Sequence, residues 1–521
     1  MSSTETVSQT PDDQRLSLGT KVAAGSGEAV INLGINMPKS FGFVIYNLVL
    51  GVDAVLLGLV LALPRLWDGL IDPIMGSISD NTRSKWGRRK PYMLIGGILS
   101  AVGMALICIP PTFLTSIFSD EETFGIWGLS FTALDWMAAL YFVLISLAFY
   151  TFLTIFSVPY GALTMELTSD YHERTRLMSF RTTFTYVSGI CFGWILYATT
   201  ADVFVRWAEQ AGAEDPVKTG EIYGTWVVGG VMAVIILVAA MIPTFFVKEP
   251  FGGQKQKQEK VPLLSGLKET LTQPAFVLII SAYTLAFFGI VMVIHLGNYI
   301  SIYYVHGGDR QDGFLAQSWA QTAAPFVGLG TVFLLNRLSG KIEKKLAWAG
   351  LMGVSLLGAI LTWFFYDPDI ASFRSVIDLG FWDLSIDLYL HPLLLAFVLL
   401  FPGMGATLVL TYSMIADVCD LDELKTGKRR EGMYWAVFNW IQKSAIALSL
   451  LMTGFTLDWS NFDPELTVQP DETLLSMRLW FTCTMVVTFV VAILLVLMIP
   501  INKQRMEAVQ VELKQRRGAD A

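Results

Sequence analysis

The chain consists of long apolar runs separated by short polar connections along almost its whole length. Twelve of these runs are bounded by charged or turn-forming residues and reach about the 20 residues that a membrane-spanning helix needs. They lie near residues 24–50, 54–79, 91–112, 136–163, 176–203, 222–247, 272–305, 314–336, 346–366, 388–416, 431–457 and 474–500. The pattern predicts an all-α membrane protein with twelve transmembrane helices.

One connection is longer and more highly charged than the others, and it divides the runs into six and six. This cytoplasmic linker spans residues 248–271. It separates a predicted N-terminal six-helix bundle, 24–247, from a C-terminal six-helix bundle, 272–500. The polar ends, 1–23 and 501–521, are expected to be disordered cytoplasmic tails.

A faint internal repeat supports this division. The segment MELTSDYHERTR after the fourth run resembles IADVCDLDELKTGKRR after the tenth, with an acid, Glu166 or Asp417, closing each helix. Two parallel six-helix repeats around a central substrate site define the major facilitator architecture. The alternative is that both segments are ordinary charged helix ends at the membrane surface.

Basic residues mark which connections are cytoplasmic. The connection after the second run carries five Lys and Arg residues between positions 83 and 90, whereas residues 113–135 carry four acids and no Lys or Arg. Because Lys and Arg concentrate on the cytoplasmic side, connections after even-numbered runs are predicted to be cytoplasmic. Both termini then lie in the cytoplasm, and we expect a multi-pass protein of the bacterial inner membrane.

The composition leaves no room for a large soluble domain. The chain is 54% hydrophobic and 15% charged, whereas soluble chains are about 25% charged. The net charge of −8 does not indicate a nucleic-acid partner, because acids contribute little to membrane topology. The four cysteines and four histidines are scattered, without the spacing of a metal site, a disulfide framework or a nucleophile with its base. We therefore expect neither an enzyme nor a cofactor.

Two aspartates lie near the middle of the second run, where a charge costs at least ~2.5 kcal/mol. Arg65, Asp68 and Asp72 follow the spacing i, i+3, i+7 and share one helix face. Two carboxylates one turn apart suit a hard cation such as Na⁺, or a proton held on one of them. The alternative is a structural ion pair with Arg65.

Four further charges fall within apolar runs. Lys443 is a candidate mobile counter-charge for the aspartates. Arg181 either lines a substrate site or extends to the membrane surface. Glu28 either binds sugar hydroxyls or caps its helix, and Lys39 requires an acid, a cavity or an anionic ligand near it.

The end of the second run carries a candidate charge latch. In GSISDNTRSKWGRRK, Asp80 is followed by Arg88 and Arg89, and we group Arg65 with these gating charges. The alternative is a basic loop that only obeys the topology rule.

Several long motifs resemble one transporter family. The segment RLWDGLIDPIMGSISDNTRSKWGRRKPY from Arg65 to Tyr92 resembles the second-helix signature of the glycoside-pentoside-hexuronide:cation symporters, the family of melibiose permease. VPYGALTMELTSDYHERTRLMSFR, YYVHGGD and IADVCDLDELKTGKRREGMYWAVFNWIQK resemble later family segments in the same order. The resemblance extends from about Gly25 to about residue 500.

The resemblance implies cation-coupled symport of a sugar into the cell by alternating access. Asp68 and Asp72 match the family's cation-binding aspartates, and Thr154 matches the threonine that completes their site. Lys443 matches a lysine between the cation and sugar sites, and Arg181 matches an arginine that lines the sugar site.

Other positions depart from the family pattern. Glu28 stands where many members have Asp, and Asn439 stands where melibiose permease has a threonine. Ile71 replaces an asparagine that ligates the cation, which leaves Na⁺ and H⁺ both open. Ser157 and Gly161 replace an aspartate and a tryptophan that hold the galactosyl group, so melibiose itself is not expected.

The predicted protein is therefore a secondary transporter, functionally monomeric, for a monovalent cation and a sugar, glycoside or hexuronide. Lys39, Arg181 and Lys443 point to an anionic sugar. The alternative within the same fold is a cation-coupled transporter of lysolipids or other amphiphiles.

Overall fold

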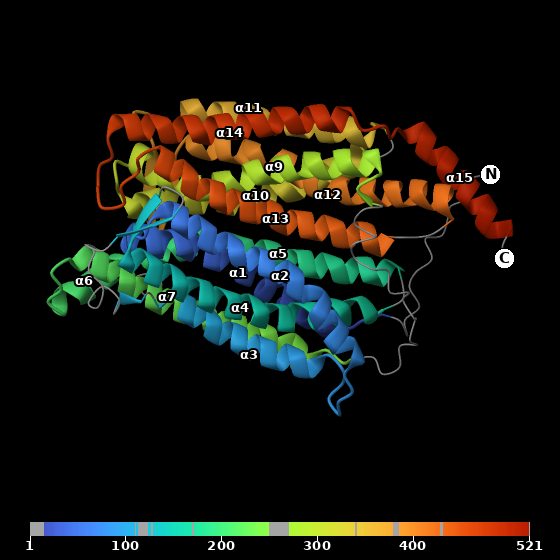
Figure 1. Ribbon diagram of the computed structural model, residues 1–521, viewed down its shortest axis with the longest axis horizontal. Helices are drawn as coiled ribbons and strands as arrows, with labels where there is room; N and C mark the ends of the chain where they lie inside the picture. Colours follow the sequence, from blue (N-terminus) through green and yellow to red (C-terminus); the bar gives the residue numbers. More distant parts are fainter. Residues whose placement is uncertain are drawn as a thin grey trace. The chain divides into compact units, whose positions relative to one another are not determined.

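The computed structural model describes residues 15–109, 111–112, 123–126, 129–168, 171–249, 270–338, 341–378, 385–427 and 431–519. The chain divides into two compact units (Figure 1). Unit 1 comprises Met1–Ile45 and Trp67–Gln256, and unit 2 comprises Tyr46–Leu66 and Lys257–Ala521. The boundary at residues 256 and 257 falls inside the expected linker, but Tyr46–Leu66 groups with the second unit.

The helices follow the predicted order. In the first half they are α1 (Leu18–Phe41), continued by the π-helical η2 (Gly42–Val49), α2 (Ala54–Asn81), α3 (Lys90–Ile107), α4 (Ala133–Glu166), α5 (Tyr171–Thr199), α6 (Asp202–Gln210) and α7 (Pro216–Phe246). In the second half they are α9 (Pro274–Tyr299), continued by the π-helical η4 (Ile300–Val305), α10 (Arg310–Leu338), α11 (Lys344–Phe365), α12 (Leu393–Thr426), α13 (Glu431–Trp459), α14 (Asp471–Leu497) and α15 (Lys503–Ala519). Each predicted span contains one long helix.

Ten helices in the described part of the chain are long and apolar enough to cross a membrane. Neither α1 nor α13 is among these ten. These two helices carry several of the polar residues that the sequence assigns to the transport site, including Glu28 and Lys39 on α1 and Lys443 on α13. Charged and polar side chains lower the hydropathy of a span. The helix α2 is still apolar enough to be among the ten, although it carries Asp68 and Asp72.

The internal repeat extends to helix packing. In unit 1, α3 packs on α4 and α7, and α1 packs on α5 and α7. In unit 2, the helices six spans later make the same pairs: α11 packs on α12 and α14, and α9 packs on α13 and α14. Close approach depends on glycine, since a Cβ on Gly96 of α3 would lie 2.5 Å from the backbone nitrogen of Phe156 on α4.

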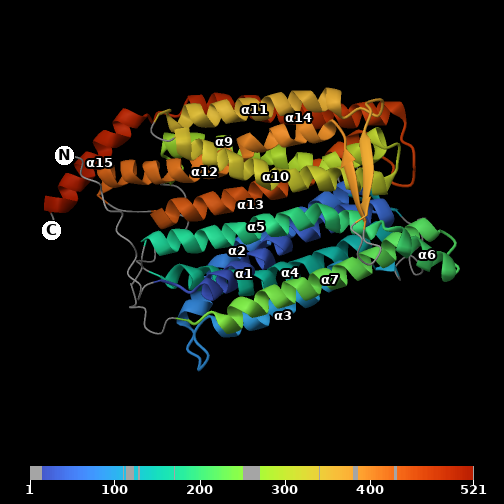
Figure 2. The ribbon, with the colours of Figure 1, turned by 180° about the vertical axis from the view of Figure 1, so that it is seen from behind.

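The two β-hairpins of the structure were not predicted. Short hairpins, β1 (Thr123–Ile126) with β2 (Leu129–Thr132) and β3 (Phe373–Asp378) with β4 (Ser385–Leu390), form antiparallel two-stranded sheets between long helices. Figure 2 shows that the β3–β4 hairpin and α15 lie at opposite ends of unit 2.

The expectation of a disordered C-terminal tail is wrong, because Lys503–Ala519 form the helix α15. Met506, Val509 and Leu513 follow the spacing i, i+3, i+7 and are buried. Three apolar side chains on one face give the helix a surface to dock by, although the segment is polar on average.

The β3–β4 hairpin is anchored to unit 2 by a histidine cluster. His306 Nε2 lies 2.9 Å from the hydroxyl of Tyr389 on β4, and His306 Nδ1 lies 2.7 Å from the carbonyl of Ser301. His391, two residues after Tyr389, accepts a hydrogen bond from the backbone nitrogen of Leu393 and is 4% exposed. Burial and the neighbouring His306 lower the pKa of His391 to about 4, from its usual 6.5.

Acid is therefore expected to loosen this hairpin. A lowered folded-state pKa means that the unfolded chain binds the proton more tightly, so stability falls as pH drops from about 6.5 toward about 4. Hydrogen exchange of the β4 amides, corrected for intrinsic rates, should rise between pH 7 and pH 5. His391→Asn, which keeps an acceptor but does not titrate, should show a smaller rise. An equal rise in both proteins would contradict the role of His391.

Candidate functional site

The aspartate pair of α2 meets one hydroxyl of α4 inside unit 1. The Thr154 Oγ1 atom lies 2.8 Å from Asp68 Oδ1 and 3.3 Å from Asp72 Oδ1. Asp68 is 8% exposed, and Thr154 is fully buried. The structure thus brings together the three residues assigned to a cation site, although 82 residues separate Thr154 from Asp72.

Oxygen atoms from two carboxylates and a hydroxyl converge at this point. Hard cations prefer such ligands, and a negative pair near mid-membrane is stabilised by a positive charge beside it. Ile71, between the aspartates, contributes no oxygen. These three oxygen ligands suit a small monovalent cation or a proton.

A second contact fixes the register of α2 against α4. Trp67 Nε1 donates a hydrogen bond of 3.1 Å to Thr151 Oγ1, one helical turn before Thr154. No sequence pattern indicates this pair. The adjacent Trp67 and Asp68 thereby bind two hydroxyls that are three residues apart on one helix, which positions the carboxylate.

Glu28 and Arg181 form an ion pair between α1 and α5. Arg181 Nε and one terminal nitrogen lie 2.8 and 2.7 Å from Glu28 Oε2. The other terminal nitrogen donates to Thr164 Oγ1 at 3.0 Å, and the guanidinium lies 5.2 Å from the ring centre of Tyr160. Arg181 therefore points into unit 1, and Glu28 binds it rather than capping a helix end.

A polar stripe continues from Glu28 along α1. Asn32, Asn36 and Lys39 follow at intervals of four, four and three residues, which places all four side chains on one helix face. Lys39 Nζ donates to Asn36 Oδ1 at 2.9 Å, and Asn32 Nδ2 donates to Ser188 Oγ of α5 at 2.8 Å. The two asparagines were missed, although their spacing with Glu28 was a readable signal.

The remaining predicted substrate residues lie apart from this cluster in the chain. Ser157 is half-buried on α4, three residues after Thr154. Asn439 and Lys443 lie on α13, which belongs to unit 2. Asn439 is exposed and Lys443 is half-buried, so the pairing of Lys443 with the aspartates stays a prediction.

The charge latch centres on Glu166, which the sequence pattern indicates only as the end of a repeated segment. Arg88 and Arg89 each donate to Glu166 Oε1 at 2.6 Å, and Arg89 lies 3.5 Å from Asp80 Oδ1. Glu249 accepts from the backbone nitrogens of both arginines, at 3.1 and 3.4 Å. The latch joins the α2–α3 connection to the ends of α4 and α7.

Arg65 is not part of this latch. It is 2% exposed and precedes Asp80 by 15 residues on α2, a rise of about 22 Å along the helix. It lies one turn from Asp68 instead.

Glu166→Gln is expected to lower the melting temperature of the detergent-solubilised protein by several degrees. Arg89 is 3% exposed, so losing the carboxylate leaves a buried charge poorly compensated, and hydrogen bonds to charged groups contribute about 1.5–3 kcal/mol. Glu209→Gln, on an exposed position of α6, is the matched control and should change stability by less than about 0.5 kcal/mol. Equal melting temperatures for the two variants would refute the latch.

Two repeated helical units, with one buried and one half-buried aspartate on a membrane-spanning helix, define a transporter of the major facilitator class. The fold is similar to that of a bacterial homologue of the human lysosomal transporter Spinster, with a TM-score of 0.63, 12% identity, and coverage of 96% of this chain and 98% of that one. Residues 23–503 match the family described as MFS/sugar transport protein, and the chain belongs to this family. The predicted family relationship is confirmed, and the protein is a multi-pass membrane transporter rather than an enzyme.

Three similar proteins align with nearly the whole chain. An uncharacterized symporter of Synechocystis is 28% identical over 91% of this chain and 92% of its own. The glucuronide carrier protein homolog of Escherichia coli is 21% identical, with 97% of each chain covered. The mouse sodium-dependent lysophosphatidylcholine symporter 1 is 22% identical over 94% of this chain and 87% of its own.

Proposed function

We propose that the protein couples the entry of a monovalent cation, Na⁺ or H⁺, to the uptake of a sugar, glycoside or hexuronide across the bacterial inner membrane, with both termini in the cytoplasm. The observation that carries this proposal is the convergence of Asp68, Asp72 and Thr154. Carboxylates at this depth are costly unless a positive partner binds them, and transporters use such sites for ions.

The polar stripe of α1 and its partners supply the proposed sugar site. Amide groups of Asn32 and Asn36 and the carboxylate of Glu28 suit sugar hydroxyls. Arg181 presents a planar fork of donors and Lys39 a point charge, and both favour a carboxylate. The name of the Escherichia coli relative, a glucuronide carrier homolog, agrees with a hexuronide substrate.

Coupling follows from linkage between the two sites. Cation binding to Asp68 and Asp72 favours the conformation that binds sugar, and sugar binding must then strengthen cation binding by the same factor. Lys443 replaces the cation when the site returns empty, and rocking of the two bundles gives alternating access.

Transport by purified protein in proteoliposomes tests the proposal. Glucuronide, neutral glycosides and pentoses are supplied with an inward Na⁺ gradient, an inward H⁺ gradient or no gradient. Accumulation that requires one of the gradients is the expected result. Equal uptake with and without gradients would reject cation coupling, and no uptake of any sugar would reject the substrate class.

The mouse relative supports a second candidate, cation-coupled transport of lysophospholipid. The same proteoliposomes, supplied with fluorescent lysophosphatidylcholine, distinguish the two. Saturable lysolipid uptake that glucuronide does not inhibit would favour the second candidate.

A further inference from the structure

Two large aromatic side chains lie next to each other on the surface of α12 and α13 in unit 2. Tyr412 of α12 is 41% exposed, and Trp435 of α13 is 44% exposed. Their ring centres lie 4.9 Å apart, and their planes are nearly perpendicular, at 88°. Neither residue belongs to the cation site or to the polar stripe of α1, so the pair needs an explanation of its own.

Buried rings hold this pair in place. Phe438 stacks on Trp435, with ring centres 5.5 Å apart and planes 21° apart, and it contacts Tyr412 edge-on at 5.5 Å. Tyr283 of α9 packs on Phe438 at 4.8 Å, and its hydroxyl accepts a hydrogen bond of 2.6 Å from Gln442. Phe438 and Tyr283 are fully buried. Because Phe438 covers one face of the Trp435 indole, the opposite face is left for a flat ligand.

The face of α13 that carries Trp435 is polar. Trp435, Asn439 and Gln442 follow the spacing i, i+4, i+7, and Asn439 is exposed while Gln442 is half-buried. Polar side chains within a membrane span face the interior of a bundle or a water-filled path rather than hydrocarbon. Trp440, which is also exposed, lies about 140° around the helix from Trp435. Trp435 therefore lies on the side of α13 that a polar ligand can reach, and Trp440 does not.

An aromatic surface beside an amide suits a sugar ring. One face of a pyranose presents C–H groups, which pack on an aromatic ring, while the hydroxyls at its edge need hydrogen-bond partners. Asn439 lies one turn of α13 from Trp435, a rise of about 6 Å, and its amide both donates and accepts. Ligand sites typically combine aromatic walls with a few polar groups in this way.

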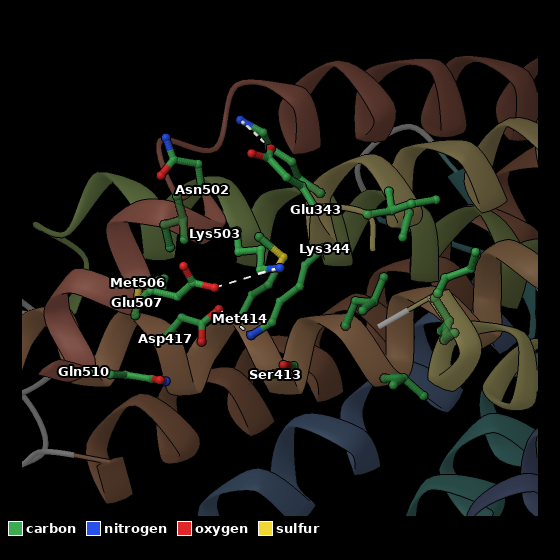
Figure 3. A pocket seen from close by; sticks show the side chains of 18 residues that line it. Glu343, Lys344, Ser413, Met414, Asp417, Asn502, Lys503, Met506, Glu507 and Gln510 are labelled. Atoms are coloured by element: carbon green, nitrogen blue, oxygen red, sulfur yellow. Dashed lines mark hydrogen bonds and ion pairs between the residues drawn. The ribbon is translucent and has the colours of Figure 1, made fainter. Parts of the chain in front are cut away.

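The cavity beneath α15, also in unit 2, does not offer this combination. It has a volume of about 360 Å³ and lies between α15 and the adjoining ends of α10, α11 and α12 (Figure 3). Three lysines and three acids line it, and each lysine lies between 2.6 and 3.9 Å from an acid. Among the described residues of its lining there is no aromatic ring. Its balanced charges favour neither an anionic nor a cationic ligand.

We propose that Trp435 and Tyr412 form an aromatic platform for the apolar face of the sugar ring, and that Asn439 binds the hydroxyls at the edge of that ring. The proposal rests on sugar transport as the function and adds a selectivity to it. The platform recognises the ring and not a charge, so it selects cyclic sugars, neutral or acidic, over open-chain polyols.

Initial rates of uptake into proteoliposomes over a concentration series test the platform, with methyl glucuronide and methyl glucoside as probes. Trp435→Leu removes the ring and should raise KM for both probes roughly 3–10-fold with little change in kcat, the size of effect expected for an aromatic contact. Trp435→Phe keeps a ring and should retain most of the affinity. Trp440→Leu removes an indole that is 47% exposed on another side of the same helix, and it should leave KM unchanged.

The outcomes separate the platform from the proposed function. An unchanged KM in Trp435→Leu, in a protein that transports the probes, would overturn the platform and leave sugar transport standing. Equal increases in KM for Trp435→Leu and Trp440→Leu would also overturn it, because any lost tryptophan would then have the same effect. Uptake of neither probe by the unmodified protein would reject sugar transport and the platform together. Tyr412→Phe and Tyr412→Leu repeat the comparison from α12, and only the leucine variant should raise KM.

Discussion

Asp68→Asn and Asp72→Asn are each expected to reduce gradient-driven accumulation of substrate sharply while leaving a folded protein. Asparagine keeps the shape and an acceptor oxygen for Thr154, but it removes the charge that binds the cation. Coupling between two ligands typically changes affinity 5–150-fold, so accumulation should fall by about that factor. The measurement is uptake into proteoliposomes under the Na⁺ or H⁺ gradient that drives the unmodified protein.

The matched control for this experiment is Asp215→Asn. Asp215 caps α7 through the backbone nitrogen of Lys218, and asparagine caps a helix equally well. Thr154→Ser and Thr154→Ala give a graded second test, because serine keeps the hydroxyl and alanine removes it. Accumulation by either aspartate variant at the level of the control would exclude the aspartates as the cation site.

Arg181→Gln is expected to reduce hexuronide uptake at low substrate concentration by 10–100-fold. The variant loses the charged hydrogen bonds to Glu28, each worth about 1.5–3 kcal/mol, and it leaves the Glu28 carboxylate without its arginine. If Arg181 binds the substrate carboxylate, the loss for a neutral glycoside should be smaller. Initial rates over a substrate series separate an increase in KM from a fall in kcat.

Two variants separate stability from transport at this pair. Glu28→Gln with Arg181→Gln removes both charges, so thermal stability should recover relative to Arg181→Gln alone while transport stays low. Arg206→Gln, at an exposed position of α6, is the control for loss of an arginine. Wild-type hexuronide transport by the double variant would exclude this ion pair from the substrate site.

The spans could be read from the sequence because a bilayer imposes a length and an apolar composition on every helix that crosses it. Helical periodicity alone placed Asp68 and Asp72 on one face of their helix. Thr154 came from family resemblance, since no spacing links a threonine on α4 to residues on α2. The hairpins and α15 were missed because short strands and a three-residue apolar face give weak local signals.

The partners of the charged residues were not readable from the sequence. The sequence allows Glu28 to be either a sugar ligand or a helix cap, and it allows Arg181 either to line the substrate site or to extend to the membrane surface. In the structure, a contact of 2.7 Å pairs these two residues, which are 153 positions apart in the chain. Glu166 was noted for its place in a repeat, yet the structure makes it the acceptor for both Arg88 and Arg89.

The sequence by itself determined the membrane-spanning class, the order of the helices and the position of an acidic pair within a span, because hydropathy and helical periodicity are local properties of the chain. Only the tertiary structure decided that Arg181 pairs with Glu28, that Glu166 accepts from Arg88 and Arg89, and that α15 packs on α12. Ion pairs, hydrogen bonds and cavities depend on distances of a few ångströms between segments far apart in the chain, and packing alone sets those distances.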